Sequence, residues 1–401
     1  MLHALRQAVR AQVPGAERDF WARAAAHGTP LVEPDPEGDP AYRRVTFLWR
    51  DDPERPVEGV LALLHTVTDK ARYARDLAPH LMERIEGTGV WAVSHRLRAD
   101  HRASYQFHGG PLDELLGTDR VSWRRVLDRA VPDPLCRTPP LPARGGRHPA
   151  SVLELPEAPP QPYAARAEGV PRGASTRTEL DGRGVTAHLP HGHDAQRGPY
   201  AVAVLLDGEM WGPVLHAGDI LDGLHADSEL PPTVGLLVDT MEHRMEDLSC
   251  SGEFADWLAD TLLPWAAERY GATADPARTV VAGQSAGGLT AAYAAFRRPD
   301  AFGLALSQSG SFWWPDPDPA DPEAPDPEWL TRQYARAPRR AVRLHLEVGL
   351  QEWMLLAENR RLRNVLRARG YPVSYEEFNG GHDYACWRGG LAHGLAKLLR
   401  G

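Results

Sequence analysis

Residues 278–299 read RTVVAGQSAGGLTAAYAAFRRP, and this stretch decides the fold. It begins with a short apolar run typical of a buried strand and ends with an Ala-rich run typical of a helix. Between them lies GQSAG at 283–287, a G-x-S-x-G pattern. At such a strand-turn-helix junction the central serine is held in a strained backbone conformation, which presents its hydroxyl at the edge of a sheet. We therefore predict that Ser285 is a catalytic nucleophile.

The sequence around this stretch predicts further strands and helices in alternation. Alternating strands and helices indicate a mostly parallel sheet covered on both faces. Together with the serine turn, they predict an α/β-hydrolase catalytic domain over residues 176–401. The segments are YAVAVLLDGE (200–209), TVGLLVDT (233–240), the helix EFADWLADTLLPWAAERYG (253–271), GLALSQSG (303–310), VRLHLEVG (342–349), the helix AENRRLRNVLRARGY (357–371) and VSYEEFNGGHD (373–383).

A serine hydroxyl needs a general base, and in this fold the order along the chain is serine, acid, histidine. His382 follows the last predicted strand and lies near the C-terminus, so it is the candidate base. The acid is expected in the loop after the penultimate strand, where Glu352 lies. Asp383 and Glu358 are alternatives, and a Ser-His dyad without an acid stays open.

Stabilising the oxyanion requires backbone N–H donors. The residue after the nucleophile, Ala286, supplies one. The second is expected from the loop after an earlier strand, where LLDGEMW (205–211) contains Gly208 and Glu209. Either N–H is a candidate for the second donor.

The first part of the chain predicts a separate domain. Residues 1–28 are typical of an amphipathic helix, and residues 41–110 contain short β-type segments separated by turns, which predicts a small β-sandwich over 1–131. Residues 132–175 are rich in Pro, Ala, Arg and Gly, so we expect a linker there. We expect the first domain to influence substrate specificity and the second to carry the chemistry.

Composition excludes several classes of function. The chain has 401 residues with a formal net charge of -9, and no basic run stands out, so nucleic-acid binding is not expected. No segment offers the roughly 18 apolar residues of a membrane span, and the N-terminus lacks the features of a signal peptide. We therefore expect a cytoplasmic protein that acts on a small molecule, without a membrane partner, a metal or another cofactor.

These motifs together resemble the enterochelin (enterobactin) esterases, hydrolases that open ferric siderophore trilactones. The likeness is carried by LLDGEMW, GQSAGGLTAAYAAFRRPDAFG, SQSGSFWW, the terminal NGGHDYACWRGGL and the segment 239–265, with TFLWRD and SYQF in the first domain. It implies that Ser285 and His382 are the catalytic pair and that Glu352 is the acid. The acidic insert at 315–328 departs from the family pattern.

The resemblance also implies a pocket for a large, aromatic and anionic ligand, which needs planar cations and ring faces. Arg244 resembles the family's substrate-facing arginine. The other candidate substrate-binding residues lie within or beside the motifs: Trp211, Trp313, Trp314 and Arg388. The alternatives for function are an acyltransferase on the same fold and an esterase that acts on another carboxylic ester, such as a feruloyl ester.

Overall fold

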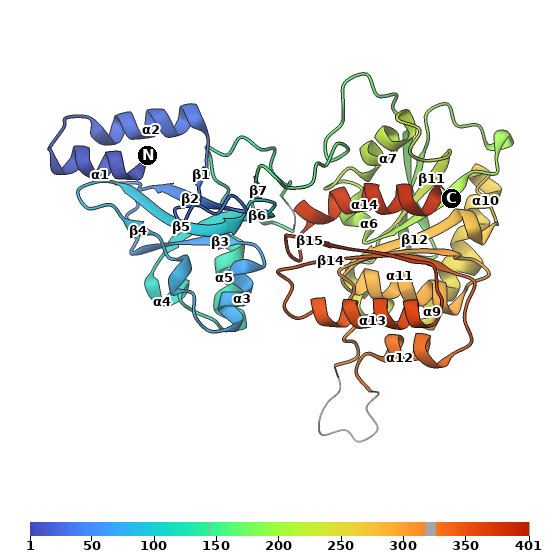
Figure 1. Cartoon of the computed structure of the whole chain (residues 1–401). Coiled ribbons are helices and arrows are strands. Elements are labelled where there is room, and N and C mark those ends of the chain that lie inside the picture. Colours follow the sequence, from blue (N-terminus) through green and yellow to red (C-terminus); the bar gives the residue numbers. More distant parts are fainter. Residues whose placement is uncertain (144, 317–325, 401) are drawn as a thin grey trace. The chain divides into compact units, whose positions relative to one another are not determined.

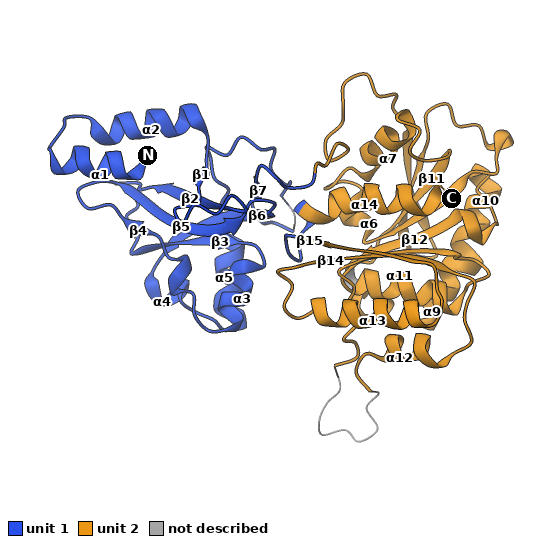
Figure 2. Cartoon of the chain, in the orientation of Figure 1, with its two compact units in different colours: residues 1–159, 379–385 blue, residues 160–378, 386–401 orange. Residues whose placement is uncertain are grey.

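The computed structural model describes residues 1–143, 145–316 and 326–400. The chain separates into two compact units: unit 1 comprises residues 1–159 and 379–385, and unit 2 comprises residues 160–378 and 386–401 (Figure 2). This division differs from the sequence-based one in two ways. The expected linker at 132–175 contains strand β7 (Ser151–Glu154), which pairs with β6 (Arg102–Gly110). In addition, a short segment near the C-terminus belongs to unit 1.

Unit 1 is built on two antiparallel sheets (Figure 1). The strand order is β1-β2-β5-β4 in one sheet and β3-β6-β7 in the other. The remaining elements are α1 (Leu2–Arg10), α2 (Ala16–His27), β1 (Leu31–Pro34), β2 (Tyr42–Arg50), β3 (Gly59–Leu64), α3 (Val67–Tyr73), β4 (Glu83–Arg84), β5 (Val90–Arg98), α4 (Leu112–Leu115) and α5 (Arg120–Arg129).

Alternating side chains join the two sheets into a sandwich. Val45 and Phe47 from β2 meet Ala103, Tyr105 and Phe107 from β6 in one buried cluster, as expected for strands whose successive side chains point to opposite faces. The predicted β-sandwich is therefore confirmed. The outer faces of the sheets are covered as well: α1 and α2 pack against one, and α4 and α5 pack against the other. For this reason β3 is buried along its whole length and does not alternate.

The expected single N-terminal helix is two helices. The helix is interrupted between α1 and α2, where Gly15 adopts a φ of 76° and precedes the first residue of α2. Pro14 lies in this break and lacks the N–H that a continuous helix would need there.

Unit 2 contains an eight-stranded sheet in the order β15-β14-β13-β12-β10-β11-β9-β8. The six strands from β10 to β15 are paired in parallel, and β9 pairs antiparallel with both β11 and β8. This is the mostly parallel α/β-hydrolase sheet that the sequence predicts. The strands are β8 (Ala174–Leu180), β9 (Arg183–Leu189), β10 (Ala201–Leu206), β11 (Thr233–Val238), β12 (Thr279–Gln284), β13 (Leu304–Gln308), β14 (Arg343–Gly349) and β15 (Val373–Phe378).

Helices cover both faces of this sheet (Figure 1). Apolar side chains of α9 to α13 share one large core with the sheet, and α6, α7 and α14 lie on the other face. The predicted long helix at 253–271 consists of α9, a single π-helical turn (Leu258–Leu262) and α10. The helices are α6 (Gly208–Trp211), α7 (Ala217–Ala226), α8 (Arg244–Asp247), α9 (Gly252–Trp257), α10 (Leu263–Tyr270), α11 (Ala286–Arg297), α12 (Trp329–Arg336), α13 (Leu356–Ala368) and α14 (Tyr384–Leu399).

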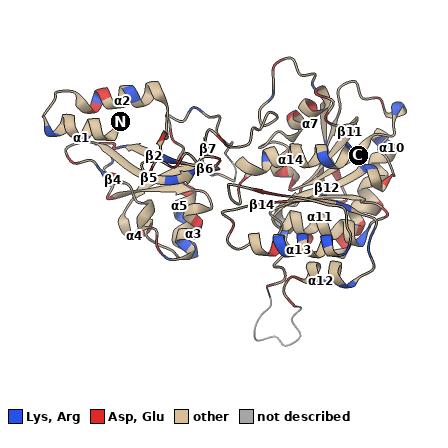
Figure 3. Ribbon diagram, in the orientation of Figure 1, with Lys and Arg blue, Asp and Glu red and all other residues tan. Residues whose placement is uncertain are grey.

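Basic and acidic residues both occur along the chain, and arginines of α13 have acidic partners (Figure 3). There Arg360 pairs with Glu377 of β15 at 2.7 Å, and Arg361 pairs with Glu358 at 2.5 Å. Exposed pairs of this kind contribute at most about 1 kcal/mol each. None of the described helices is long and apolar enough to cross a membrane.

Candidate active site

Ser285 lies at the turn between β12 and α11 in a strained conformation. Its φ is 59° and its ψ is -121°, outside the regions that non-glycine residues favour. Neighbouring backbone holds it there: Ser285 N donates to Gln308 O at 3.0 Å, and Ser311 N donates to Ser285 O at 3.0 Å. The Ser285 hydroxyl is half-buried and lies 3.3 Å from the Ser311 hydroxyl. Strain that the surroundings maintain is typical of catalytic positions.

The tight turn around Ser285 depends on glycine at two places. A Cβ on Gly283 would lie 2.4 Å from the carbonyl carbon of Gly287, and one on Gly288 would lie 2.8 Å from the Ser307 hydroxyl. Gly287 itself has more room, since the nearest atom to an added Cβ is 3.5 Å away. The close approach of β12 to α11 therefore needs Gly283 more than Gly287.

The candidate oxyanion donors are the first residues of two helices that follow neighbouring strands of the sheet. Ala286 is the first residue of α11 and Gly208 is the first residue of α6, so neither N–H has a carbonyl partner within its own helix. The preceding strands, β12 and β10, are paired in the sheet. Gly208 packs against β11 so closely that a Cβ would lie 2.6 Å from the carbonyl carbon of Leu237. Glu209, the other candidate, follows Gly208 and accepts a hydrogen bond from Thr240 N through its carboxylate.

Glu352 lies in the loop after β14, as the sequence predicts, and its side chain is buried. Its Oε1 accepts hydrogen bonds from the Ser309 hydroxyl at 2.6 Å and from Gly349 N at 2.7 Å. Trp387 Nε1 donates in turn to the Ser309 oxygen at 3.0 Å. Ser285 and Glu352 thus lie at the same carboxyl edge of the sheet, because they follow β12 and β14, which flank β13. Sequence reasoning missed Ser309, although the polar run SQSG at the end of a predicted strand was a signal.

Asp383 has a different environment. It precedes the first residue of α14, and its Oδ1 accepts from Ala385 N at 2.9 Å, as a helix-capping residue does. Its Oδ2 accepts from Ser104 N at 2.5 Å. Both oxygens therefore bind backbone donors, which favours a structural role for this carboxylate and leaves Glu352 as the better candidate acid.

His382 lies in the segment of residues 379–385 that belongs to unit 1. Both its backbone N–H and its backbone C=O form hydrogen bonds with residues of unit 1. His382 N donates to the Thr66 hydroxyl at 2.8 Å, and the His65 ring Nε2 donates to His382 O at 2.7 Å. Nothing in the sequence pointed to these two residues, which lie more than 300 positions earlier.

A chain of buried polar side chains crosses the sheet beneath the serine turn. Trp211 Nε1 donates to Gln284 Oε1 at 2.8 Å, Gln284 Nε2 donates to Gln308 Oε1 at 2.7 Å, and Gln308 Nε2 donates to Glu347 Oε1 at 2.6 Å. A satisfied buried network of this kind fixes one arrangement of its strands. It also corrects an expectation: Trp211 is fully buried, so its ring packs inside the protein and does not form a ligand surface.

Arg244 begins α8 and forms a two-point ion pair with Asp207. Arg244 Nε and Nη2 lie 2.7 and 2.9 Å from the two carboxylate oxygens, and the Thr240 hydroxyl donates to the same carboxylate at 2.8 Å. Asp207 is buried, whereas the arginine side chain is 34% exposed. Because Asp207 directly precedes Gly208, this pair holds Arg244 beside the candidate oxyanion loop.

The other candidate substrate residues are half-buried. Trp313 and Trp314 follow β13, and the Trp314 ring contacts Trp329 edge-on with centroids 6.1 Å apart. Arg388 on α14 donates from Nε to Gln161 Oε1 at 3.0 Å. Of the acidic insert at 315–328, residues 317–325 lie outside the described part of the chain.

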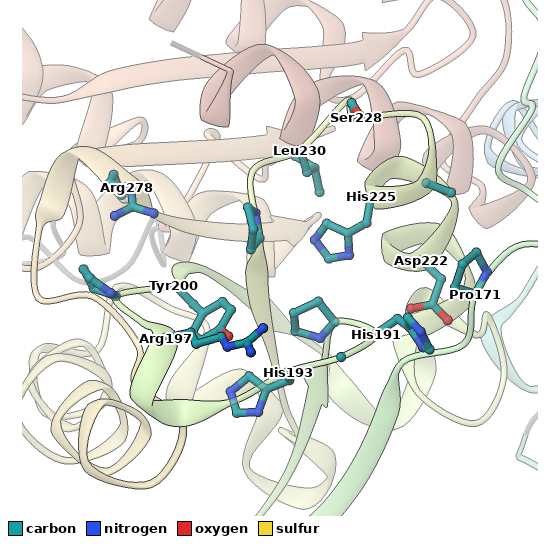
Figure 4. A pocket seen from close by; sticks show the side chains of 15 residues that line it. Pro171, His191, His193, Arg197, Tyr200, Asp222, His225, Ser228, Leu230 and Arg278 are labelled. Carbon is teal, nitrogen blue, oxygen red and sulfur yellow. The ribbon is translucent and has the colours of Figure 1, made fainter.

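One cavity of about 580 Å³ lies elsewhere in unit 2 (Figure 4). Tyr200, Pro232 and Arg278 line it, and each directly precedes a strand, β10, β11 or β12 respectively. It therefore lies at the amino edge of the parallel strands, whereas Ser285 lies at the carboxyl edge. His191, His193 and Arg197 also line this cavity, and no predicted site residue does.

Burial has a marked effect on Glu347, the last member of the polar network. Removal from water raises the pKa of this carboxyl to about 8. The native state thus keeps the proton between the ordinary carboxyl pKa and about pH 8, whereas the unfolded chain releases it. Where the native state binds more protons, stability falls as pH rises.

We expect Glu347→Gln to remove this pH dependence while keeping the acceptor for Gln308. Between pH 5.5 and 7.5 the free energy of unfolding of the wild type should fall relative to the variant by up to about 1.4 kcal/mol per pH unit. Urea unfolding at several pH values measures the difference. The exposed Glu246→Gln serves as the control. Parallel curves for the wild type and Glu347→Gln would show that Glu347 is ionised in the native state.

Comparisons with known proteins agree with this geometry. Residues 177–398 match the family described as putative esterase, and residues 44–164 match the family described as enterochelin esterase, N-terminal. The iron(III) enterobactin esterase of Escherichia coli strain K12 is 35% identical over 378 residues, covering 88% of this chain and 90% of that protein. The iron(III) salmochelin esterase of Escherichia coli O6:H1 is 33% identical, covering 95% of this chain and 93% of that protein.

A solved structure extends the likeness to three dimensions. The enterobactin esterase from Shigella flexneri, crystallised in the presence of enterobactin, aligns with a TM-score of 0.75 and 33% identity, covering 90% of this chain and 93% of that one. Both the first domain and the catalytic domain are therefore shared with these relatives, over nearly their full length. The chain belongs to the enterochelin esterase family and is a carboxylic ester hydrolase.

Proposed function

We propose that the protein hydrolyses the ester bonds of catecholate siderophores of the enterobactin type, with Ser285 as nucleophile, His382 as general base and Glu352 as the acid. The observation that carries this proposal is the strained Ser285 at the start of α11, in a chain at least 33% identical over most of its length to esterases named for enterobactin and salmochelin.

The reaction would proceed in two steps. In the first, the Ser285 oxygen attacks the ester carbonyl while His382 takes the hydroxyl proton, and the negative oxygen is stabilised by the N–H groups of Ala286 and of Gly208 or Glu209. The bond to the leaving alcohol then breaks, and His382 returns the proton to that alcohol. In the second step, water attacks the acyl-enzyme by the same route and releases the carboxylic acid.

We assign substrate binding to basic and aromatic side chains near the carboxyl edge of the sheet, where Ser285 lies. The candidates are Arg244, Trp313, Trp314 and Arg388, which offer charge and ring faces to an anionic, aromatic ligand. Iron enters this reaction as part of the substrate. Trp211 is left out because it is buried.

The direct test is product analysis by mass spectrometry. The protein is incubated with ferric and iron-free catecholate trilactones, with an aryl acetate and with a feruloyl ester, in water and in water with added alcohol. We expect linear products that have gained one water per ester cleaved, and none with Ser285→Ala. Turnover of the aryl or feruloyl ester without any of the trilactones would assign another substrate, and transfer to the alcohol in preference to water would indicate an acyltransferase.

Arg244→Ala should impair hydrolysis of the anionic ferric ligand more than that of a neutral aryl acetate. A hydrogen bond to a charged group contributes about 1.5–3 kcal/mol, so the specific loss should be roughly tenfold to a hundredfold in kcat/KM. A smaller loss on both esters is also expected, because the substitution leaves the buried Asp207 without its ion pair.

Arg183→Ala is the matched control for Arg244→Ala. Arg183 pairs with Asp247, the last residue of the same helix α8, and is also partly buried. We expect it to affect both esters equally. The measurement is kcat/KM of each variant on both esters. Equal losses in Arg244→Ala would give Arg244 a purely structural role.

A further inference from the structure

The segment that carries His382 leaves unit 2 after β15 and returns to it within α14 (Figure 2). Between these points it forms several hydrogen bonds with residues of unit 1. Arg102 N donates to Asn379 O at 3.1 Å, and Asn379 Nδ2 donates to Asp100 Oδ1 at 2.7 Å. Together with the Asp383 bond to Ser104, these contacts attach both ends of the segment to strand β6 and the turn before it. The histidine lies between these two anchors.

Thr66 contacts the middle of this segment. It lies in the turn between β3 and α3, is buried, and has a φ of 67°, a conformation that β-branched residues rarely adopt. Thr66 N donates to Asp69 Oδ2 at 2.8 Å, which holds the turn in place. Such strain costs about 1–3 kcal/mol and persists where the surroundings enforce it, often at functional sites. Here the result is that the Thr66 hydroxyl accepts the hydrogen bond from His382 N.

The fit around Thr66 is close. A Cβ on Gly381 would lie 2.1 Å from the Thr66 hydroxyl oxygen, so only glycine allows this approach next to the histidine. His65 completes the arrangement, because its own N–H donates to Ser104 O at 3.0 Å and its ring Nε2 donates to His382 O. The backbone N–H and C=O of His382 thus form hydrogen bonds with two consecutive residues, Thr66 and His65.

We propose that Thr66 and His65 are positioning residues for the general base: the turn between β3 and α3 of the sandwich fixes the backbone of His382. The inference rests on the proposed function, since it concerns the same serine and histidine. Its physical basis is that a general base must lie within hydrogen-bond reach of the proton it removes, and a displacement of about 1 Å can reduce the rate roughly a hundredfold. The first domain would then contribute to the chemical step as well as to specificity.

The test uses the full chain with Thr66→Val, which keeps the shape and removes the hydroxyl acceptor. We expect kcat to fall about tenfold to a hundredfold, by similar factors on an aryl acetate and on the ferric trilactone, with little change in KM. Thr66→Ser, which keeps the hydroxyl, should recover most of the activity. Reaction of Ser285 with a fluorophosphonate probe should slow in parallel in Thr66→Val, because the probe also needs the base.

Thr68→Val is the matched control. Thr68 is buried in the first turn of α3, directly after Thr66 and Val67, and its hydroxyl accepts from Leu64 N and donates to Ala62 O, away from the His382 segment. We expect it to lower the melting temperature without lowering kcat of the folded enzyme. A loss in Thr68→Val as large as in Thr66→Val would mean that general destabilisation of α3 is the cause, which would overturn the inference.

Two further outcomes separate the inference from the proposed function. If Thr66→Val keeps wild-type kcat on both esters while His382→Ala is inactive, the positioning role is wrong and the proposed function stands. If His382→Ala is itself active, the proposed base is wrong, and the inference fails with it. A loss confined to the ferric trilactone would give Thr66 a role in specificity and overturn the positioning role.

Discussion

Ser285→Ala should abolish ester hydrolysis while leaving the fold intact. Removing the serine of a catalytic triad has cost on the order of 10⁶ in kcat elsewhere, so we expect a loss of at least about 10³ on every ester. The backbone hydrogen bonds of Ser285 to Gln308 and Ser311 do not involve the hydroxyl, and they remain in the variant. Steady-state kinetics with an aryl acetate, supported by circular dichroism, measure the effect.

His382→Ala should cause a loss of similar size. Since the nucleophile and the base act as a unit, the double variant should be no slower than either single one. His191→Ala, in the cavity at the opposite edge of the sheet, is the control and should keep full activity. More than a tenth of the wild-type rate in a folded Ser285→Ala protein would disprove the assignment of the nucleophile.

Glu352→Gln is the substitution with the next largest expected effect. The amide oxygen can still accept from Ser309 and Gly349, so the loop should keep its conformation. The negative charge that would stabilise a protonated histidine is lost, and an amide can also favour the wrong tautomer. We expect kcat to fall about a hundredfold or more on both small and large esters, but less than with Ser285→Ala.

Asp383→Asn provides the comparison, because this carboxylate was the alternative acid. Its oxygens bind Ser104 N and Ala385 N, and an asparagine can satisfy only one of them with its oxygen. The expected result is a lower melting temperature and a smaller loss of kcat than in Glu352→Gln. If the two losses were found in the reverse order, Asp383 would be the acid, and comparable small losses would indicate a Ser-His dyad.

The catalytic half was predictable from the sequence because its signals are local. A strand, a glycine-rich turn and a helix follow each other directly around Ser285, and the position of Glu352 follows from counting strands. The α/β-hydrolase sheet and the sandwich were predicted correctly for the same reason. The roles of Ser285, His382 and Glu352 stay predictions until the variants above are measured.

The parts that sequence reasoning missed depend on contacts between distant residues. Thr66 and His382 are 316 positions apart, and no pattern in either neighbourhood reveals that they share a hydrogen bond. Trp211 was a candidate ligand surface because it lies within the motif LLDGEMW and offers a ring face, yet its N–H bonds to Gln284 inside the core. Strand β7 was hidden because it is only four residues long and lies within a Pro-rich stretch.

The return of residues 379–385 to unit 1 bears on how this protein can be recombined with its relatives. A chimera that exchanges only residues 1–159 would combine the sandwich of a relative with this protein's own residues 379–385. The partners that correspond to Thr66 and Gly381 would then come from different parents. A second crossover around residues 379–385 would keep these partners together. Unit 1 is therefore discontinuous in sequence, and exchanging it as a whole would also exchange the loop that carries the proposed base.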